Sequence, residues 1–381
     1  MSLQTLDDLP AESERVLLRT DYNVPINDGK VQDTYRVERS VPTIQALQDK
    51  GVSQILISCH IGRPDKPSED TSTEALVPVL RSFLPELKVV HLDKPVPGPE
   101  EIPSRDEADI VLLENIRYTA GEIYNSDDVA RGLAKLCDTY VNDAFGVGHR
   151  KHSSVHAIQH FTPTYYGKLI EKEVAVAAEI IQADNIGVVL GGSKLTSKLP
   201  LIQKLGDKSS FIGIGGAMIF PFFAVNGWST GRGNIEKKSV ESAEKVINHE
   251  ALSLPSDIIV ANSATNPTGV RCVEPDEIPE DLLGLDVGPK TVREYTKQLN
   301  AADIVVWNGP LGYYETPVFA KATKKLMENL RTHAGKVIIG GGDTGALLHR
   351  EGIPDSDFYH VSTGGGAFLE LLKEETLPVL P

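Results

Sequence analysis

Several features that would define other protein classes are scarce in this chain. Its only cysteines, Cys59, Cys137 and Cys272, are widely spaced, so neither a disulfide framework nor a zinc cluster is indicated. No uninterrupted apolar stretch approaches the ~18 residues of a membrane span. The first residues, MSLQTLDDLPAESER, lack the basic start and apolar core of a secretory signal, and they are too acidic for a transit peptide. We therefore expect a cytoplasmic protein.

Positive charge is also in deficit. The chain has 53 acidic and 38 basic side chains, which gives a formal net charge of −15. This balance argues against nucleic acid or an anionic membrane as a partner. It does not exclude a small anionic substrate, because such a ligand responds to a local basic pocket and not to the total charge.

The pattern that is present is a regular alternation of strands and helices. A length of 381 residues predicts two domains at about 150 residues each. Near-continuous apolar runs predict strands, and helix-period segments such as 36–51, 72–87, 126–138 and 316–335 lie between them. The predicted strands lie within 15–24, 53–60, 109–115, 138–145, 185–192, 210–216, 257–262, 303–309, 336–343 and 358–363. This order is typical of an α/β protein whose parallel sheets are covered by helices on both faces.

A change in organisation falls near the middle of the chain. Residues 168–182, KLIEKEVAVAAEIIQ, form a long amphipathic helical pattern with no strand immediately before it. We place the domain boundary at this helix. The last residues, EETLPVLP, have no core of their own and are expected to pack on one of the domains.

Four glycine-rich turns follow strands in the second half: LGGSK, IGIGGAM, IGGGDT and STGGGAF. Ligands of open parallel sheets collect at the carboxyl ends of strands, and helix N-termini suit phosphate. Each turn has a plain alternative, because glycine also simply permits a tight turn. The second turn is weak as a dinucleotide fingerprint, since Met218 stands where the third glycine belongs, and GxxxxGK[ST] is absent.

Lys194 and Lys198 follow the first glycine turn. Pro200 fits the first turn of a helix, so we expect the helix to begin near Ser197 with both lysines beside its positive end. Asp343 follows the third turn and could hold Mg²⁺ against phosphate oxygens. Its alternative role is a helix N-cap.

Charged side chains follow the strands of the first half as well. Arginine binds carboxylate and phosphate through paired hydrogen bonds, so this set suits a small, multiply charged anion. Its members are Asp21, Asn23, Arg36, His60, Arg63, Arg117, His149, Arg150 and His152. An arginine after a strand can equally form a surface ion pair. HRKH (149–152) lacks a third metal ligand nearby, and Cys59 is interpreted as a buried thiol.

Ten segments in order resemble the phosphoglycerate kinase family, of the bacterial type: LRTDYNVPINDGKVQDTYRV, SCHIGRP, LLENIRY, VNDAFGVGHRKHSS, GKLIEKEV, LGGSKLTSK, GLDVGPKT, WNGPLGYYE, GGGDT and HVSTGGGAFLELL. The resemblance implies two Rossmann-like domains joined by a hinge helix. Residues 1–165 would bind 3-phosphoglycerate, 166–183 would be the interdomain helix, and 184–365 would bind the nucleotide. A tail from about 366 to 381 would pack on the first domain.

The resemblance also implies an activity and its residues. The reaction is Mg-dependent phosphoryl transfer between 1,3-bisphosphoglycerate and ADP, giving 3-phosphoglycerate and ATP, in glycolysis and gluconeogenesis. By matching position, the phosphoglycerate site would comprise Asp21, Asn23, Arg36, His60, Arg63, Arg117 and Arg150. The nucleotide site would comprise Lys194, Lys198, Asn308, Pro310, Glu315, Gly341, Gly342, Asp343 and Thr344. Asp343 would be the magnesium ligand, and Ser362 and Thr363 would act during closure.

Four positions depart from the family pattern: Ser197, Ala217, the turn GRGN at 231–234, and LKEETLP near the end. They affect the adenine pocket and tail docking more than the reaction. We hypothesise that Arg36 and Lys194 stabilise the migrating phosphoryl group and that Lys198 holds nucleotide phosphates. The family implies a monomer. Two alternatives stay open: a non-catalytic nucleotide-binding relative and, less consistent with the lysines, a nicotinamide dehydrogenase.

Overall fold

The chain forms two compact units. The computed structural model describes residues 3–233 and 235–381, apart from the side chain of Asp343. The first unit comprises Met1–Ala175 with Thr376–Pro381, and the second comprises Val176–Glu375, so the boundary falls within helix α5 (Lys168–Gln182). We expected a tail from about residue 366 to 381 to pack on the first unit. Only Thr376–Pro381 belongs to that unit, because α12 (Gly365–Glu374) belongs to the second.

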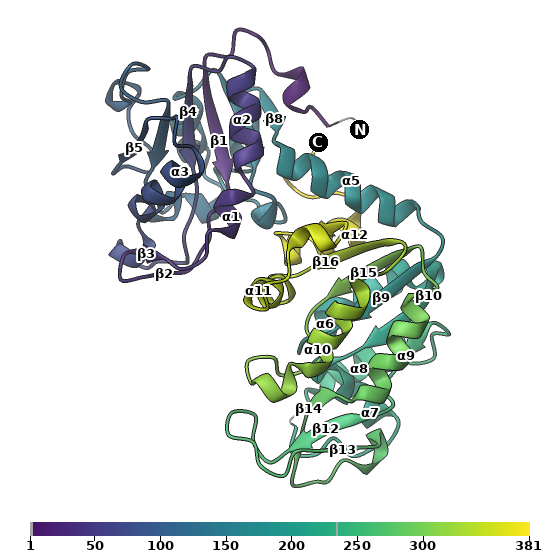
Figure 1. Cartoon of the computed structure of the whole chain (residues 1–381). Helices are drawn as coiled ribbons and strands as arrows, with labels where there is room; N and C mark the ends of the chain where they lie inside the picture. The colour runs from purple at the N-terminus through teal and green to yellow at the C-terminus, as the bar shows by residue number, and fades with distance from the viewer. Residues whose placement is uncertain (1–2, 234) are drawn as a thin grey trace. The chain divides into compact units, whose positions relative to one another are not determined.

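The first unit is built on a six-stranded parallel sheet with the order β5-β6-β4-β1-β7-β8 (Figure 1). Its strands are β1 (Arg15–Thr20), β4 (Gln54–Ser58), β5 (Val89–Leu92), β6 (Ile110–Leu113), β7 (Thr139–Asp143) and β8 (Thr164–Tyr166). A separate two-stranded hairpin pairs β2 (Ile26–Asn27) with β3 (Lys30–Val31).

Both faces of this sheet are buried, as the apolar runs predicted. Val16 and Leu18 of β1 belong to one apolar cluster, and Leu17 belongs to another. Successive side chains of a strand point to opposite faces, so this split places an apolar core on each side of the sheet. The helices that cover it are α1 (Tyr35–Glu38), α2 (Val41–Asp49), α3 (Val77–Phe83) and α4 (Asp127–Ala134). The fold class predicted for this half is confirmed.

The N-terminus of helix α5 is capped by a buried carboxylate from a different element, strand β7. Asp143 Oδ1, at the end of β7, accepts hydrogen bonds from the amides of Leu169 at 3.0 Å and Ile170 at 3.3 Å. Its Oδ2 accepts from the Thr43 hydroxyl at 2.6 Å, and Thr43 Oγ1 accepts from the Lys168 amide at 2.9 Å. Three amides at the start of the helix are thus satisfied by tertiary contacts.

The ionisation of Asp143 gives a test of this arrangement. Burial raises its pKa from 3.8 to about 7, although the hydrogen bonds from Thr43 and the helix amides favour the charged form. The folded protein therefore binds this proton more tightly than the unfolded chain, and stability should fall as the pH rises from about 4 to about 7. For the parent, the contribution of this one group to the free energy of unfolding should decrease by roughly 2–3 kcal/mol between about pH 5 and about pH 8.

The Asp143→Asn variant should lose that part of the pH dependence, because its side chain keeps an acceptor oxygen but does not titrate. Urea unfolding of both proteins at the two pH values measures it. Asp138→Asn is the control, since Asp138 also accepts two backbone hydrogen bonds but is exposed. Equal pH slopes in the parent and in Asp143→Asn would contradict the assignment.

The second unit contains another six-stranded parallel sheet, with the order β11-β10-β9-β15-β16-β17. Its strands are β9 (Ile186–Leu190), β10 (Ser209–Ile214), β11 (Leu252–Ser253), β15 (Ile304–Asn308), β16 (Lys336–Gly340) and β17 (His360–Val361). The fully buried strands β9 and β15 lie side by side at the centre of the sheet.

A smaller antiparallel sheet in this unit was not expected. The run 257–262, which the sequence assigned to the parallel sheets, contains β12 (Ile258–Ala261), which pairs instead with β13 (Arg271–Val273) and β14 (Leu283–Val287). Periodicity identifies a strand but not its partner, so the sequence pattern could not distinguish the two sheets.

Six further helices accompany the sheets of this unit: α6 (Leu195–Leu205), α7 (Phe220–Val225), α8 (Lys237–Glu244), α9 (Pro289–Leu299), α10 (Lys321–Leu330) and α11 (Gly342–Arg350). Helix α9 begins with Pro289 at its first position, where a missing amide hydrogen costs nothing. Among the described residues, no helix combines the length and the apolar character needed to cross a membrane.

Candidate active site

The polar residues predicted in the first unit lie at one edge of its sheet. Asp21 and Asn23 follow β1, His60 follows β4, Arg117 lies in the 3₁₀ turn Ile116–Tyr118 after β6, and Arg150 follows β7 and its 3₁₀ turn. Strands β6, β4, β1 and β7 are parallel neighbours, so their carboxyl ends meet at the same edge.

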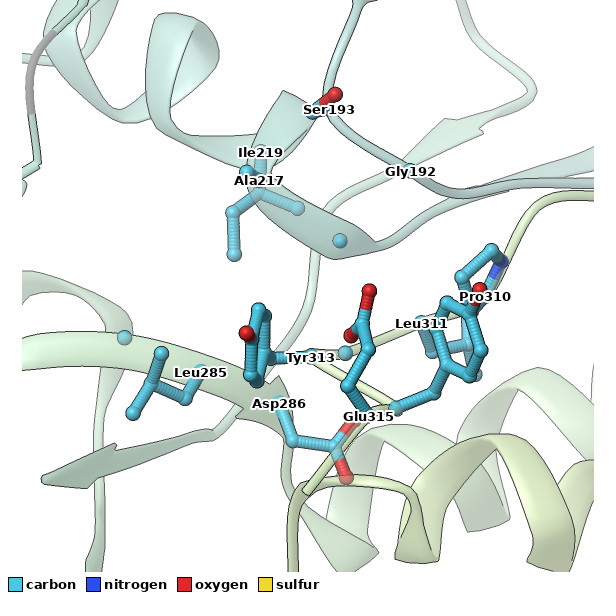
Figure 2. A pocket seen from close by; sticks show the side chains of 14 residues that line it. Gly192, Ser193, Ala217, Ile219, Leu285, Asp286, Pro310, Leu311, Tyr313 and Glu315 are labelled. Carbon is cyan, nitrogen blue, oxygen red and sulfur yellow. The ribbon is translucent and has the colours of Figure 1, made fainter. Parts of the chain in front are cut away.

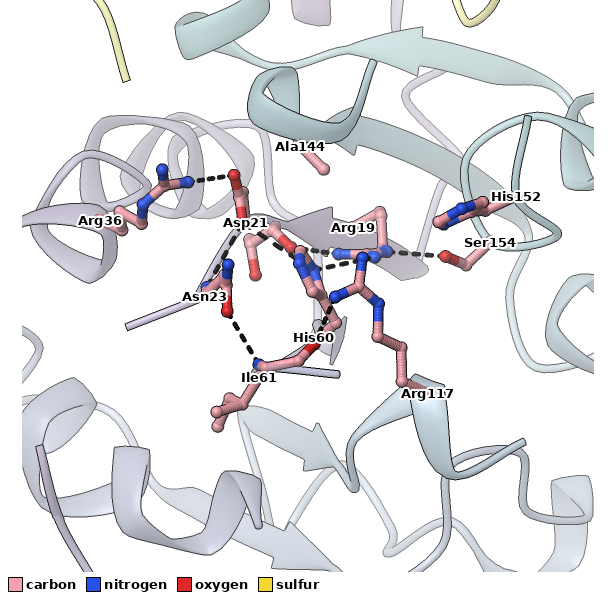
Figure 3. A network of polar contacts seen from close by, with 12 residues as sticks. Arg19, Asp21, Asn23, Arg36, His60, Ile61, Arg117, Ala144, His152 and Ser154 are labelled. Carbon is pink, nitrogen blue, oxygen red and sulfur yellow. Dashed lines mark hydrogen bonds and ion pairs between the residues drawn. The ribbon is translucent and has the colours of Figure 1, made fainter. Parts of the chain in front are cut away.

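A hydrogen-bonded network joins several of these side chains (Figure 3). Arg36 forms an ion pair with Asp21 Oδ2, and His60 Nδ1 lies 3.8 Å from Asp21 Oδ1. The side-chain oxygen of Asn23 accepts a hydrogen bond from the Gly62 amide at 2.8 Å. The structure thus brings Asp21, Asn23, Arg36 and His60 together.

Arg19 is a member of this network that the sequence analysis missed. Its side chain is buried in β1, and its Nε donates to Ser154 Oγ at 2.8 Å. Its Nη2 lies 3.4 Å from His60 Nδ1 and 3.9 Å from Glu122 Oε1. The available signal was a charged residue inside the apolar run VLLRT.

The charges of this site are strongly biased toward the cationic side. Burial opposes ionisation of Asp21, but the charges of Arg36 and Arg19 and a hydrogen bond from the Asn23 amide outweigh it and lower the pKa of that carboxyl. Burial, with repulsion from nearby arginines, lowers the pKa of His60 well below its usual value and that of His152 to about 4. Both histidines are therefore neutral near pH 7, and the arginines carry the positive charge of the site.

Arg117 shows the same crowding of positive charge. Burial lowers its pKa to about 10, and repulsion from Arg19 and Arg150 adds to this effect. The group remains charged at neutral pH, so the arginines are held together against their mutual repulsion. An anionic ligand would relieve that repulsion.

A pocket of about 550 Å³ opens beside the network. Arg63, Arg117, Arg150 and His152 line it, together with Lys66. The two remaining predicted arginines, Arg63 and Arg150, thus share a hollow with Arg117.

In the second unit, the glycine turns again lie at the carboxyl ends of parallel strands. Gly191 and Gly192 follow β9, Gly215 and Gly216 follow β10, and Gly341 follows β16. The loop Pro310–Glu315 follows β15.

These turns contact one another closely. The Gly192 amide donates to the Pro310 carbonyl at 2.9 Å, and the Gly216 amide donates to the Leu311 carbonyl at 2.7 Å. A Cβ on Gly191 would lie 2.1 Å from the Pro310 carbonyl oxygen, so only glycine permits this approach. The amides at 192 and 216 therefore bind protein carbonyls, and these glycines build the wall of a pocket.

That pocket has a volume of about 230 Å³ and lies between the turns (Figure 2). Ala217 and Ile219 lie on one side, and Leu285 and Tyr313 lie on the other. Of the nucleotide residues predicted from the sequence, Pro310 and Glu315 line it. The sequence analysis did not assign Leu285 or Tyr313 to a site, because neither residue type carries a chemical signal in isolation.

Beside this pocket, Lys198 contacts the side chain of Asn308. The lysine Nζ donates to Asn308 Oδ1. The Nδ2 of Asn308 is buried and has no hydrogen-bond partner among the described residues. An unsatisfied buried donor next to a lysine suits an anionic oxygen. Thr344 lies close by, since its buried Oγ1 accepts from the Gly309 amide at 3.0 Å.

Helix α6 begins earlier than predicted. Its first residue is Leu195, and the expected start near Ser197 was wrong. Lys194 is the exposed N-cap residue, and Pro200 lies inside the helix. The proline's missing amide leaves the carbonyl of Thr196 without its helical partner. Both lysines still lie in or beside the first turns of the helix.

The remaining predicted residues are placed only in part. The backbone of Asp343 lies at the start of α11, but its side chain lies outside the described residues. Ser362 and Thr363 are buried after β17, and Ser362 Oγ accepts from the Gly364 amide at 3.2 Å. No cluster of three or more histidine, cysteine or carboxylate side chains capable of holding a metal occurs among the described residues.

Taken together, fold and site define an α/β protein with a cluster of arginines at a sheet edge of one unit and a glycine-walled pocket, flanked by a lysine, on the other. The family model described as phosphoglycerate kinase matches residues 6–375. The phosphoglycerate kinases of Mycobacterium avium and Thermus thermophilus are each 38% identical over 99% of this chain, covering 96% and 99% of those proteins.

Solved structures of phosphoglycerate kinases also match this chain. Phosphoglycerate kinase from Coxiella burnetii matches with a TM-score of 0.84 and 29% identity, covering 99% of this chain and 98% of that one. The Pyrococcus horikoshii enzyme matches with a TM-score of 0.83, 28% identity, and coverage of 99% and 97%. This chain belongs to the phosphoglycerate kinase family, and it is therefore a phosphotransferase with a carboxyl group as acceptor. The family resemblance and the two-unit α/β fold predicted from the sequence are confirmed.

Proposed function

We propose that the first unit binds 3-phosphoglycerate or 1,3-bisphosphoglycerate and that the second binds ADP or ATP. The observation that carries the first assignment is the group of arginines held together with two neutral histidines at one sheet edge. The phosphate and carboxylate of the substrate supply the negative charge that this group lacks. Asp21 and Asn23 offer acceptors for a substrate hydroxyl.

The nucleotide assignment rests on the pocket of Figure 2 and on the groups beside it. Its apolar walls, Ile219 and Leu285, suit a flat base, and Glu315 offers a carboxylate to the ribose hydroxyls. Lys198 and the unsatisfied amide of Asn308 suit phosphate oxygens. Lys194, exposed at the N-terminus of α6, would reach the terminal phosphate.

The residues present fit Mg²⁺ only as a partner of the nucleotide. The described side chains offer no three-ligand cluster, and Mg²⁺ commonly binds one or two carboxylates together with substrate phosphates. Asp343, at the start of α11, would be that carboxylate. When bound, the ion neutralises charge on the phosphates.

The chemistry requires little proton transfer. The acceptor is a nucleotide phosphate in one direction and a carboxylate in the other, and both are ionised at pH 7. The chain's task is to position the two substrates and to stabilise the charge of the migrating phosphoryl group. We assign that stabilisation to Arg36 and Lys194. Since each ligand binds its own unit, transfer requires the two ligands to meet, and Ser362 and Thr363 are proposed to act in that step.

Removal of magnesium is expected to abolish activity reversibly. The measurement is ATP formation from 1,3-bisphosphoglycerate and ADP in a coupled assay, with Mg²⁺ omitted and then restored. Turnover should fall to background without the ion and return fully with it, and Asp343→Asn should require more Mg²⁺ for half-maximal rate.

Activity that persists after chelation would contradict the magnesium assignment. No activity under any condition would favour the non-catalytic alternative. Light scattering tests the further proposal that the chain acts as a monomer.

A further inference from the structure

A second, larger cavity lies in the second unit and belongs to neither substrate site. It has a volume of about 560 Å³, within the range of about 300–1,000 Å³ that is usual for ligand sites. Helices α9 and α10 form two of its walls, and strands β12 and β14 contribute others. Its apolar lining consists of Ile259, Val270, Val287, Val292, Val318 and Ala322.

One apolar residue of the cavity lining is exposed. Val270, which precedes β13, is 40% exposed, and it is one of few large apolar side chains with such exposure among the described residues. An apolar hollow with an exposed apolar lining residue favours an apolar ligand or an apolar part of one.

Cations surround the hollow in a chain that is otherwise acidic. Arg293 of α9 and Lys321 of α10 line it, both exposed, and neither forms a hydrogen bond or ion pair within the described part of the chain. Lys325 also lines it but pairs with Glu328 at 3.0 Å. Two uncompensated cations beside an apolar cavity complement a ligand with one anionic end.

The acidic residue of the lining is buried and hydrogen-bonded to the backbone. Asp286 of β14 is buried, and its Oδ2 accepts a hydrogen bond from the Ala322 amide at 3.0 Å. Burial raises its pKa well above the usual value, although the amides of Ala322 and Val287 favour the charged form. Burial thus disfavours the negative charge that would otherwise repel an anionic ligand.

We propose that this cavity binds a small amphiphilic carboxylate, such as a medium-chain fatty acid, with its alkyl chain against Val292 and Val318 and its carboxylate between Arg293 and Lys321. The proposal does not depend on the function assigned to the two substrate sites. Asp286 also lines the nucleotide pocket of Figure 2, so the two hollows share one lining residue.

Calorimetric titration of the full-length chain with sodium octanoate tests the proposal. We expect saturable binding of one octanoate per chain. Across hexanoate, heptanoate and octanoate, affinity should rise by roughly three- to four-fold for each added methylene. Neutral 1-octanol should bind more weakly than octanoate, because it lacks the charge.

Two variants distinguish the contribution of the cations to binding from that of the apolar lining. The double variant Arg293→Gln/Lys321→Gln should weaken octanoate roughly five-fold and leave 1-octanol unchanged, since each exposed ion pair contributes modestly. Val270→Asp should weaken both ligands. The matched control is Lys297→Gln, an exposed lysine on α9 outside the lining, which should change neither.

Equal binding of octanoate and 1-octanol by the parent, or uptake of several molecules per chain, would overturn the proposal. So would displacement of octanoate by ADP together with an unchanged affinity in the double variant, because that result would place octanoate in the nucleotide pocket.

Discussion

Replacement of Arg36 with alanine is expected to lower kcat by roughly 10²–10⁴-fold, the range seen when a group that stabilises transition-state charge is removed. The Arg36 side chain is 26% exposed, so it reaches solvent from the same edge at which it pairs with Asp21. If it acts on the migrating phosphoryl group, the loss should fall on kcat more than on the KM for 3-phosphoglycerate. Steady-state kinetics in both directions measure this split.

Arg39→Ala is the matched control for Arg36. It lies one helical turn further along the chain, and its guanidinium packs 5.7 Å from the centre of the Tyr35 ring. We expect its kcat to remain close to that of the parent. Thermal unfolding of both variants verifies that the fold is retained. Near-normal turnover of a folded Arg36→Ala protein would refute the assigned role.

Replacement of Lys194 with alanine should reduce kcat to a similar extent, roughly 10²–10⁴-fold. Lys194 is an exposed N-cap residue whose side chain makes no cap hydrogen bond, so its removal should cost little stability. A large loss of turnover with an unchanged melting temperature would therefore report on chemistry. Lys194→Arg should recover part of the rate, because it restores the charge but not its position.

Lys204→Ala is the control for this second prediction. Lys204 lies in the last turn of the same helix and pairs with Glu375 on the surface, where such pairs contribute at most about 1 kcal/mol. Its kcat should match that of the parent. If Lys194→Ala and Lys204→Ala had the same turnover, the proposed contact of Lys194 with the terminal phosphate would be wrong.

Much of the first-unit site was predictable because parallel strands impose a simple rule. Polar residues that follow neighbouring strands must gather at one edge, so Asp21, His60 and Arg117 could be grouped from the sequence without knowledge of the strand order. Arg19 could not be placed in the same way. It lies within β1, and its contacts with Ser154 and Glu122 bring together residues more than 100 positions apart.

The second unit shows the same contrast between features that the sequence predicted and contacts that it did not. The glycine turns marked the strand ends, but the sequence did not reveal that the Gly192 and Gly216 amides bind the carbonyls of Pro310 and Leu311 instead of a ligand. The start of α6 was misplaced because Pro200 was assigned to a first turn, its statistically favoured position. Packing of the buried Leu195, Leu201 and Leu205 stabilises a longer helix that contains the proline.

The sequence by itself determined the class of this protein: local apolar periodicity specifies the strands and helices, and ten short segments identify the family. Beyond the gathering of polar residues at the strand ends, only the tertiary structure decided which side chains meet. The capping of α5 by Asp143, the burial that keeps His60 neutral, and the cavity between α9 and α10 all depend on contacts between distant segments. Such contacts arise from the packing of whole elements, and no local pattern of residues encodes them.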